Sequence, residues 1–175
     1  MSEIREIATV EFSSELPIKE LITDANLRRR MSAIVKSGVA CGIECLRRAG
    51  IERPSAIITA TALGCIADSE KFLSKVVDDV QPSPTPFIQS TFNTIGSQLA
   101  MITGCTGYNM TYVNRTNSLD DALLDARLYL HEAPAKSTVL VVYAEEQTPT
   151  SEFVLSKLPC ALHLPASAKA ILLTN

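Results

Sequence analysis

The 175-residue chain lacks several features that define broad classes of protein. No stretch approaches the roughly 20 apolar residues that a membrane-spanning helix needs. The first residues carry two glutamates and no apolar core of a secretion signal. The 16 basic and 19 acidic side chains give a net charge of −3, whereas nucleic-acid-binding proteins normally have a basic surplus. We therefore expect a soluble, cytoplasmic protein with no membrane span and no nucleic-acid partner.

Residues that hold cofactors and metals are also scarce. Only seven glycines occur, and none has the GxGxxG or Walker spacing of a phosphate-binding loop. His131 and His163 lie far apart, one in a helical pattern and the other in a strand-like run, so each reads as a packed or surface side chain. No metal site and no cofactor are expected.

The five cysteines form an odd number and fall in apolar stretches. They are Cys41, Cys45, Cys65, Cys105 and Cys160. This distribution, without an export signal, is typical of buried, reduced thiols. Cys41 and Cys45 would share a helical face, but no histidine or third cysteine lies nearby to complete a zinc site.

What the sequence does contain is an alternation of strand and helix patterns. Strands are predicted over residues 4–12, 56–63, 111–113 and 138–143, with a final hairpin of 160–164 and 168–173. Helices are predicted over residues 27–49, 68–80, 87–103 and 119–131, and Gly50 would end the first of them. The apolar run 56–63 favours a strand buried on both faces, as in a parallel sheet. We predict a single α/β domain over residues 1–175, with one mixed sheet between helices.

The predicted helix 87–103 is distinctive because its sequence, FIQSTFNTIGSQLAMIT, has no charged side chain. Pro82, Pro84 and Pro86 precede it and should break the chain there. A helix without charge on any face is buried all round, either in a core or under a partner chain.

The order of these segments resembles the N-terminal part of a β-ketoacyl-[acyl carrier protein] synthase. The resemblance is carried by three arginines before Met31-Ser32, by the strand 56–63 with Gly64, by the segment 83–100, by the loop 104–109, and by the strand 139–143 followed by Ala144-Glu145-Glu146. It is most similar to the short, chain-length-factor-like relatives of aryl polyene and related pigment pathways. The resemblance implies a thiolase-like half, in which a five-stranded mixed sheet has helices on both faces.

In that family, the first half of a complete ketosynthase carries a cysteine nucleophile at a strand-to-helix turn, and the second half supplies two histidines. Here the resemblance places Thr116 at the nucleophile position, and a hydroxyl is a poor nucleophile without an adjacent base. Ser118 and Asp121 have the spacing of a capping box, and carboxylates in this turn would oppose a thiolate. Cys105 and Cys65 are alternative nucleophiles, but one precedes this strand and the other follows a different strand.

Two surfaces are candidates for partner binding. Arg28, Arg29, Arg30, Lys36, Arg47 and Arg48 form a basic stripe around the predicted helix 27–49. The stripe would attract an acidic acyl carrier protein or be an ordinary solvated face. The uncharged segment and the following strand 108–113, which family members pair across the dimer axis, are expected to form a subunit interface. The interface residues are Phe87, Phe92, Asn93, Gln98, Met101, Tyr108 and Tyr112.

The leading hypothesis is a non-catalytic ketosynthase-like protein. It would be the partner or chain-length factor of a condensing enzyme in fatty-acid, polyketide or aryl polyene-type biosynthesis, in a homo- or heterodimer. The chain ends at Asn175, before a second half could supply the histidines. The alternatives are an active 3-oxoacyl-[acyl carrier protein] synthase or acyltransferase with an unconventional nucleophile, and a small-molecule-binding protein.

Overall fold

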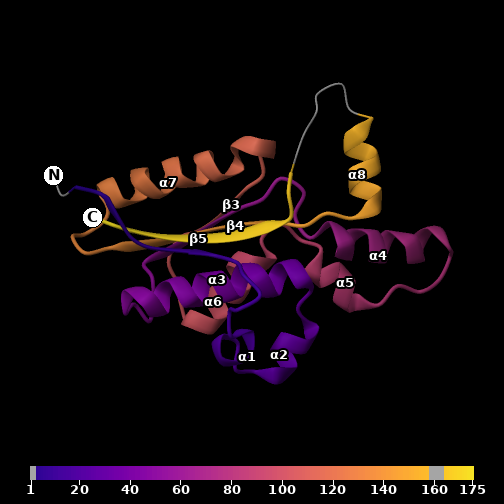
Figure 1. The fold of residues 1–175 in the computed structure, drawn as a ribbon, viewed down its shortest axis with the longest axis horizontal. Helices are drawn as coiled ribbons and strands as arrows, with labels where there is room; N and C mark the ends of the chain where they lie inside the picture. The colour runs from indigo at the N-terminus through magenta and orange to yellow at the C-terminus, as the bar shows by residue number, and fades with distance from the viewer. Residues whose placement is uncertain (1–2, 158–163) are drawn as a thin grey trace.

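The computed structural model describes residues 3–157 and 164–175, and at its centre is a five-stranded sheet in the order β1-β5-β4-β2-β3 (Figure 1). The strands are β1 (Arg5–Glu11), β2 (Ala56–Ala60), β3 (Asn109–Tyr112), β4 (Thr138–Glu145) and β5 (Ser167–Thr174). β2 pairs in parallel with β3 and β4, whereas β5 is antiparallel to both β1 and β4. The predicted mixed sheet of five strands is therefore confirmed.

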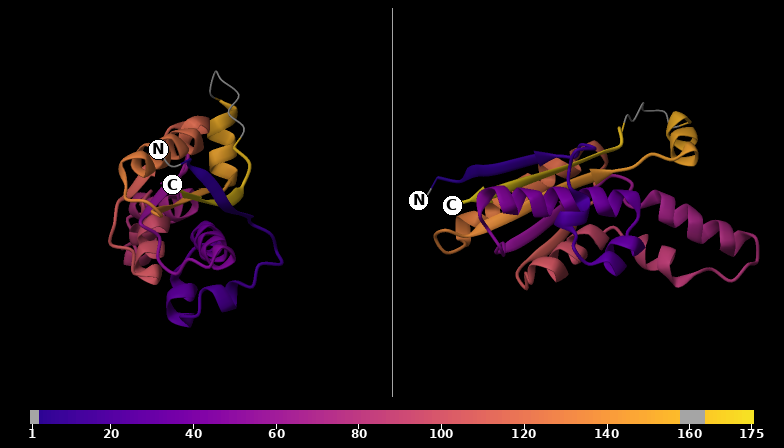
Figure 2. Two further views of the ribbon diagram at one scale, coloured as in Figure 1. Left: turned by 90° about the vertical axis from the view of Figure 1, so that its left-hand side faces the viewer. Right: turned by 60° about the horizontal axis from the view of Figure 1, so that its bottom comes forward.

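Helices cover both faces of this sheet, as predicted. They are α1 (Ile18–Leu21), α2 (Ala25–Arg30), α3 (Ala33–Ala49), α4 (Ile66–Val77), α5 (Pro84–Gln89), α6 (Thr94–Thr103), α7 (Ser118–Glu132) and α8 (Pro149–Ser156). α3 and α6 lie on one face and α7 on the other (Figures 1 and 2). Alternate residues of each strand face opposite sides, so β2 contributes Ile57 to the core under α3 and Ile58 to the core under α7.

Close packing of α3 against α6 depends on glycine. A Cβ atom on Gly38 would lie 2.9 Å from Cδ1 of Ile95, and one on Gly42 would lie 2.8 Å from Cδ2 of Leu99. A larger side chain at either position would therefore force the Ile95 or Leu99 side chain to shift.

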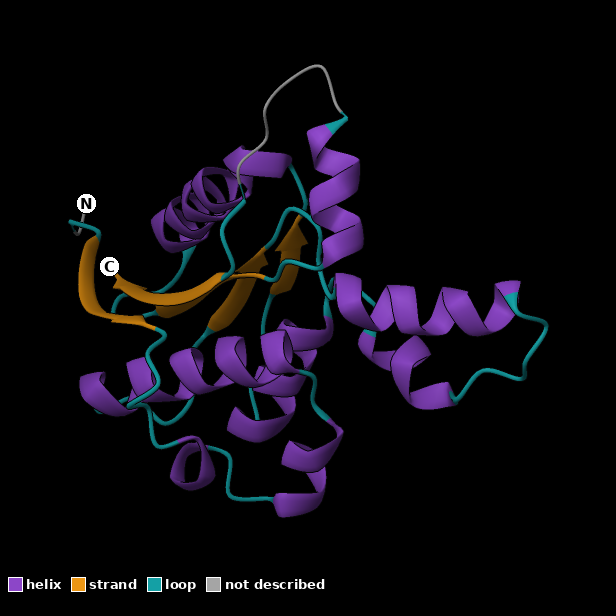
Figure 3. Cartoon of the chain, turned by 45° about the vertical axis from the view of Figure 1, so that its right-hand side comes forward, coloured by secondary structure: helices purple, strands orange, loops and turns teal. Residues whose placement is uncertain are grey.

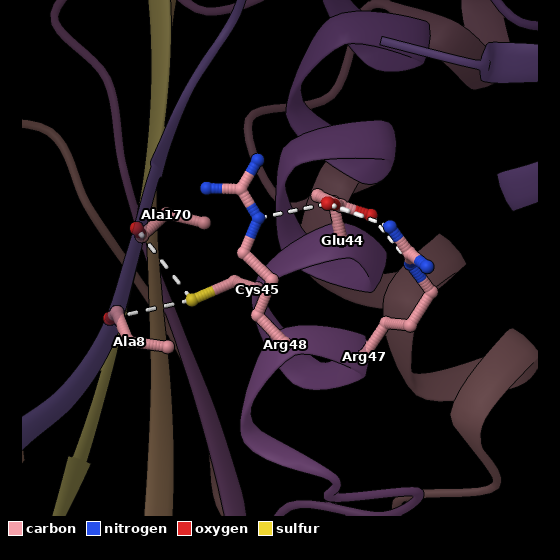
Figure 4. Close-up of polar contacts among 6 residues, drawn as sticks. All are labelled: Ala8, Glu44, Cys45, Arg47, Arg48 and Ala170. Carbon is pink, nitrogen blue, oxygen red and sulfur yellow. Dashed lines mark hydrogen bonds and ion pairs between the residues drawn. The ribbon is translucent and has the colours of Figure 1, made fainter.

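The opposite side of α3 contacts the sheet through its cysteines. The Cys45 thiol lies 3.4 Å from the carbonyl oxygen of Ala8 and 3.7 Å from that of Ala170 (Figure 4). Cys41, Cys45, Cys65 and Cys105 are all buried free thiols, as predicted. Cys160 lies outside the described residues.

The predicted helix 27–49 is wrong as a single helix. Met31 and Ser32 have extended backbones, with ψ angles of 136° and 174°. This break separates α2 from α3, so the predicted basic stripe is divided between two helices. Gly50 ends α3 in the left-handed conformation, at a φ of 67°, as its position predicted.

The predicted helix 87–103 is also two helices. α5 already begins within the proline run, because the first turn of a helix tolerates proline. It ends at Gln89, and α6 begins at Thr94.

The strand 168–173 of the predicted final hairpin is confirmed as β5, whereas residues 160–163 of the other strand lie outside the described residues. The predicted pairing of these two strands is wrong, because β1 and β4 occupy both edges of β5. α8 had no sequence signal that we recognised.

The last residue, Asn175, ties β5 to the end of α7. Its Nδ2 donates to the carbonyl oxygens of Leu130, Ala133 and Pro134 at 2.7, 3.1 and 3.2 Å. Its Oδ1 accepts from the Ser137 amide at 3.0 Å. One side chain thus satisfies carbonyls that the helix end leaves unpaired.

We predict that Asn175→Ala lowers the free energy of unfolding by about 2 kcal/mol, because it leaves these polar groups without partners. Chemical denaturation monitored by circular dichroism measures the change. Asn26→Ala is the matched control, because Asn26 is exposed. Equal stability of Asn175→Ala and the unmodified chain would contradict this role.

Candidate functional site

The carboxyl ends of the parallel strands β2, β3 and β4 share one edge of the sheet, where ligand sites of α/β proteins usually form. Here β3 connects to α7 through a short 3-10 turn, Arg115–Asn117. Arg115 has a φ of 52°, which makes this strand-to-helix connection sharp. The structure places Thr116 in the turn, exposed to solvent.

The hydroxyl of Ser118 fixes this turn to the sheet. Ser118 is fully buried, and its Oγ lies 2.8 Å from the carbonyl oxygens of both Thr61 and Arg115. The same oxygen accepts from the Asn114 amide at 2.7 Å. Ser118 therefore joins the end of β2 to the start of α7.

The predicted capping box at this helix is wrong. Ser118 already has helical backbone angles, so the N-cap residue is Asn117, whose side chain makes no capping bond. The Asp121 carboxylate instead accepts from Nδ2 of Asn114 at 2.7 Å. The sequence pattern was misread because the buried contact to Thr61 draws the serine side chain inward.

A buried glutamate at the end of β4 organises the same edge. Glu145 accepts hydrogen bonds from Oγ1 of Thr61 at 2.8 Å, from the Ala62 amide, and from the Leu63 amide at 3.3 Å. Burial raises the pKa of the Glu145 carboxyl, although these three donors act in the opposite direction. The only signal in the sequence was a pair of glutamates directly after an apolar strand, and sequence reasoning missed its role.

Neither of the two alternative thiols lies in the turn that contains Thr116. Cys65 is the N-cap residue of α4, after β2, and Cys105 precedes β3 and is buried at the other end of that strand. Burial and the neighbouring Glu146, Asp68 and Glu145 carboxylates raise the pKa of Cys65 to about 12. Cys65 is therefore a protonated thiol at neutral pH, and a poor nucleophile.

A histidine that could act as a general base is also absent from this edge in the parts of the chain that the structure describes. His131 is exposed near the end of α7, the opposite end of that helix from Thr116. His163 lies outside the described residues. Within residues 3–157 and 164–175, no group of three or more His, Cys, Asp or Glu side chains is arranged to hold a metal ion.

β3 is an edge strand of the sheet and lies beside α6. We call the surface formed here the β3 face and define it by three predicted interface residues, Asn93, Met101 and Tyr108, together with Met110 and Val113, which were not predicted. All five are exposed, Met101 by 71%. An open groove between α6 and β3 is lined by Asn93, Met110 and four further residues. The expectation that residues 87–103 are buried all round is therefore wrong for this chain by itself.

The other predicted interface residues differ in how far they are exposed to solvent. Phe87 and Phe92 are 57% and 50% exposed, and Phe87 packs against Phe72 of α4 with ring centroids 5.2 Å apart. Tyr112 is half-buried. Gln98 is also half-buried, and its Oε1 has no hydrogen-bond partner among the described residues.

Tyr108 is held against α7. Its hydroxyl donates to Oδ2 of Asp125 at 3.0 Å, and its ring stacks on Tyr129 with centroids 5.8 Å apart. Partial burial and this bond to a carboxylate raise the pKa of Tyr108 to about 12.

The basic residues form two separate groups. Arg28, Arg29, Lys19 and Lys36 line an open cleft formed by α1, α2 and α3. Arg47 and Arg48 instead bind the buried carboxylate of Glu44, at 2.7 and 2.8 Å (Figure 4). The hydrogen bond from Arg47 lowers the pKa of Glu44 against the effect of burial.

These features define a thiolase-like half-domain of the ketosynthase type. The family model "Beta-ketoacyl synthase, N-terminal domain" matches residues 12–173, and the chain belongs to this family. No curated protein matches the chain. Within the described residues, no helix is long and apolar enough to cross a membrane.

Solved structures confirm the fold. A chain from the complex of the ketosynthase ApeO with its chain length factor ApeC, from Xenorhabdus doucetiae, matches at 18% identity with a TM-score of 0.78, covering 100% of this chain and 80% of that one. A β-ketoacyl synthase from Burkholderia phymatum matches at 14% identity with a TM-score of 0.72, covering 93% of this chain and 45% of that one. A chain of the ishigamide ketosynthase/chain length factor matches at 16% identity with a TM-score of 0.73, covering 93% and 48%. This chain thus spans about half the length of the Burkholderia phymatum chain and of the ishigamide chain.

The raised thiol pKa values predict low cysteine reactivity. A shift from 9.0 to about 12 at Cys65 lowers its thiolate fraction at about pH 8 by roughly a thousandfold, so iodoacetamide should leave Cys65 unmodified in the native chain. Peptide mass spectrometry separates its labelling from that of Cys160, and the denatured chain is the control. Rapid native labelling of Cys65 would show an activated nucleophile.

Proposed function

We propose that this chain is a non-catalytic ketosynthase-like protein that serves as the partner, or chain-length factor, of an active condensing enzyme. The observation that carries this proposal is the strand-to-helix turn after β3, which presents the Thr116 hydroxyl where the family resemblance places a cysteine. A hydroxyl needs a base beside it to attack a thioester, and the nearest described histidine lies at the far end of α7.

The surroundings of the turn support the same reading. Asp120 and Asp121 lie in the first turn of α7, where carboxylates favour the positive end of the helix dipole but oppose a developing oxyanion. The described thiols offer no replacement, because Cys65 is protonated among carboxylates and Cys105 lies at the other end of β3. This arrangement stabilises a helix start and disfavours acyl transfer.

The β3 face supports a protein partner. β3 is a short edge strand, and one of its two hydrogen-bonding edges has no neighbouring strand in the described chain. Such edges are normally covered or protected, yet here the edge is flanked by the exposed side chains of Met101 and Met110. Methionine is enriched at protein interfaces. A condensing enzyme that adds its own edge strand to β3 would cover this surface, in a heterodimer or in a homodimer of this chain.

The likeness to solved structures supports a proposed pathway. The similar solved structures include a ketosynthase with its chain length factor and an acyl-carrier protein complexed with its ketosynthase. We place this chain in fatty-acid, polyketide or aryl polyene-type biosynthesis, with an acyl carrier protein as a second partner.

Co-expression tests the partner role. We expect the tagged chain to co-purify with a full-length ketosynthase of its own organism, and Met101→Asp with Met110→Asp to abolish recovery of the complex, because two charges would be buried at the interface. Phe153→Asp is the matched control, since Phe153 is 63% exposed and lies on a different element, α8. A monomer that binds none of the organism's ketosynthases would contradict the proposal.

The same complex tests the alternative of acyl transfer by this chain. After incubation with an acyl thioester, intact-mass measurement should find the acyl group only on the partner. An adduct on this chain that disappears in Thr116→Ala would establish catalysis by an unconventional nucleophile.

The cleft of Lys19, Arg28, Arg29 and Lys36 is the proposed docking surface for an acidic carrier protein. The exposed Arg30 lies beside it, whereas Arg47 and Arg48 are partly neutralised by Glu44. Long-range attraction between such surfaces depends strongly on salt.

We predict that Arg29→Glu with Arg30→Glu weakens carrier-protein binding by on the order of tenfold at low salt, with a smaller difference at high salt. Isothermal titration calorimetry on the purified complex measures this effect. Arg127→Glu reverses an exposed charge on α7 and should leave binding unchanged. Equal losses for both variants would show a nonspecific charge effect and refute docking at the cleft.

A further inference from the structure

Four carboxyl groups gather where β4 ends and α4 begins. Glu145 and Glu146 come from β4 and the residue after it, and Asp68 and Glu70 come from the first turns of α4. We call these four residues the carboxyl cluster. The negative charges of Asp68, Glu70 and Glu145 all disfavour ionisation of Glu146.

The carboxyl cluster attaches two helices to the sheet. Glu146 accepts from the Ala67 amide, in the first turn of α4, at 3.0 Å. Glu70 accepts from Oγ1 of Thr148 at 2.5 Å, and Thr148 caps α8 by a reciprocal pair of bonds with Ser151. Both helices are thus held through polar contacts.

Apolar packing contributes little to this attachment. Asp68 is the only buried residue of α4, and Ser151 is the only one of α8. In Figure 3, α4 and α5 project from the body of the molecule, and α8 stands beside the sheet. The position of these helices therefore depends on the carboxyl cluster more than on a hydrophobic core.

The cluster has no cation in the described parts of the chain. The ion pairs found there are Arg47 and Arg48 with Glu44, and Lys169 with Glu11. Asp68 is only 7% exposed, and its Oδ2 has no hydrogen-bond partner. The end of β2 contributes no charged side chain, and the N-cap residue of α4 contributes only the Cys65 thiol.

Burial and a neighbouring carboxylate both disfavour the ionised form of a carboxyl group. Burial raises the pKa of Glu146, and the charges of Asp68, Glu70 and Glu145 raise it further. Burial also raises the pKa of Glu145. We call the state in which α4 and α8 are held on the sheet the attached state, and the state in which they are released the opened state. At any pH between the ordinary carboxyl pKa of 4.5 and the raised pKa values of Glu145 and Glu146, the attached state therefore binds more protons than the opened state.

We propose that the carboxyl cluster is a pH-sensitive clamp, which holds α4 and α8 on the sheet when it retains a proton and loosens them as it ionises. Because the attached state holds the extra proton, opening becomes easier as the pH rises through this range and levels off once the cluster is ionised. The clamp does not depend on the proposed partner role.

Hydrogen exchange measured by mass spectrometry on the full chain tests the clamp. Between about pH 4.5 and about pH 8, after correction for intrinsic rates, protection of the peptides that contain Ala67 and Ser151 should fall by up to about tenfold per pH unit for each extra proton released. Peptides of α3 provide the internal reference. Constant or rising protection in α4 and α8 would overturn the proposal.

The variant Glu146→Gln tests whether ionisation of Glu146 causes the pH dependence of protection. Its amide oxygen can still accept from Ala67, but it cannot ionise, so the pH dependence should flatten while protection at high pH increases. Glu152→Gln, an exposed position on α8, should behave like the unmodified chain. An unchanged pH dependence in Glu146→Gln would overturn the proposal. Asp68→Asn should also flatten the pH dependence of protection. It provides the test of the clamp if Glu146→Gln fails to fold.

Discussion

The arrangement of this molecule depends on the polar contacts at the end of β2. There the buried Glu145 carboxylate accepts from Thr61, Ala62 and Leu63, and the buried Ser118 hydroxyl contacts the Thr61 carbonyl oxygen. These bonds fix β2 to β4 and to α7 at the edge where the parallel strands end. A buried carboxylate without such donors would be strongly unfavourable, so its position determines the path of the chain from β2 into α4.

This constraint also limits the chemistry available at the edge. Two backbone donors there, the Ala62 and Leu63 amides, are already bound to Glu145. The turn that follows β3 exposes Thr116, and the described histidine, His131, lies at the far end of α7, while the surface around β3 exposes methionine and tyrosine. These features support our proposal that the chain acts as the partner of another subunit.

Much of the fold could be predicted from local pattern. The apolar runs at β2 and β4 identified strands buried on both faces, and the periodicity of α7 located that helix to within a residue or two. The breaks at Met31 and between Gln89 and Thr94 could not be predicted, because apolar spacing continues through both and only tertiary packing interrupts the helices. The role of Ser118 was misread for a related reason. Its spacing to Asp121 fits a cap, but a carbonyl 57 residues earlier in the chain binds its hydroxyl.

The candidate site was only partly accessible to sequence reasoning. Family resemblance located the turn that holds Thr116 and the strand that forms the β3 face. The carboxyl cluster could not be found in this way, because it joins β4 to α4 between residues far apart in the sequence, such as Glu146 and Ala67, which are 79 residues apart. The proposed role makes this chain a determinant of product length in a condensing enzyme. Its most direct test is to reconstitute the partner ketosynthase with carrier protein and extender units, with and without this chain, and to measure product lengths by mass spectrometry. We expect no condensation by this chain alone and a changed distribution of product lengths when it is added to the partner. Condensation by the chain alone, or an unchanged distribution, would contradict it.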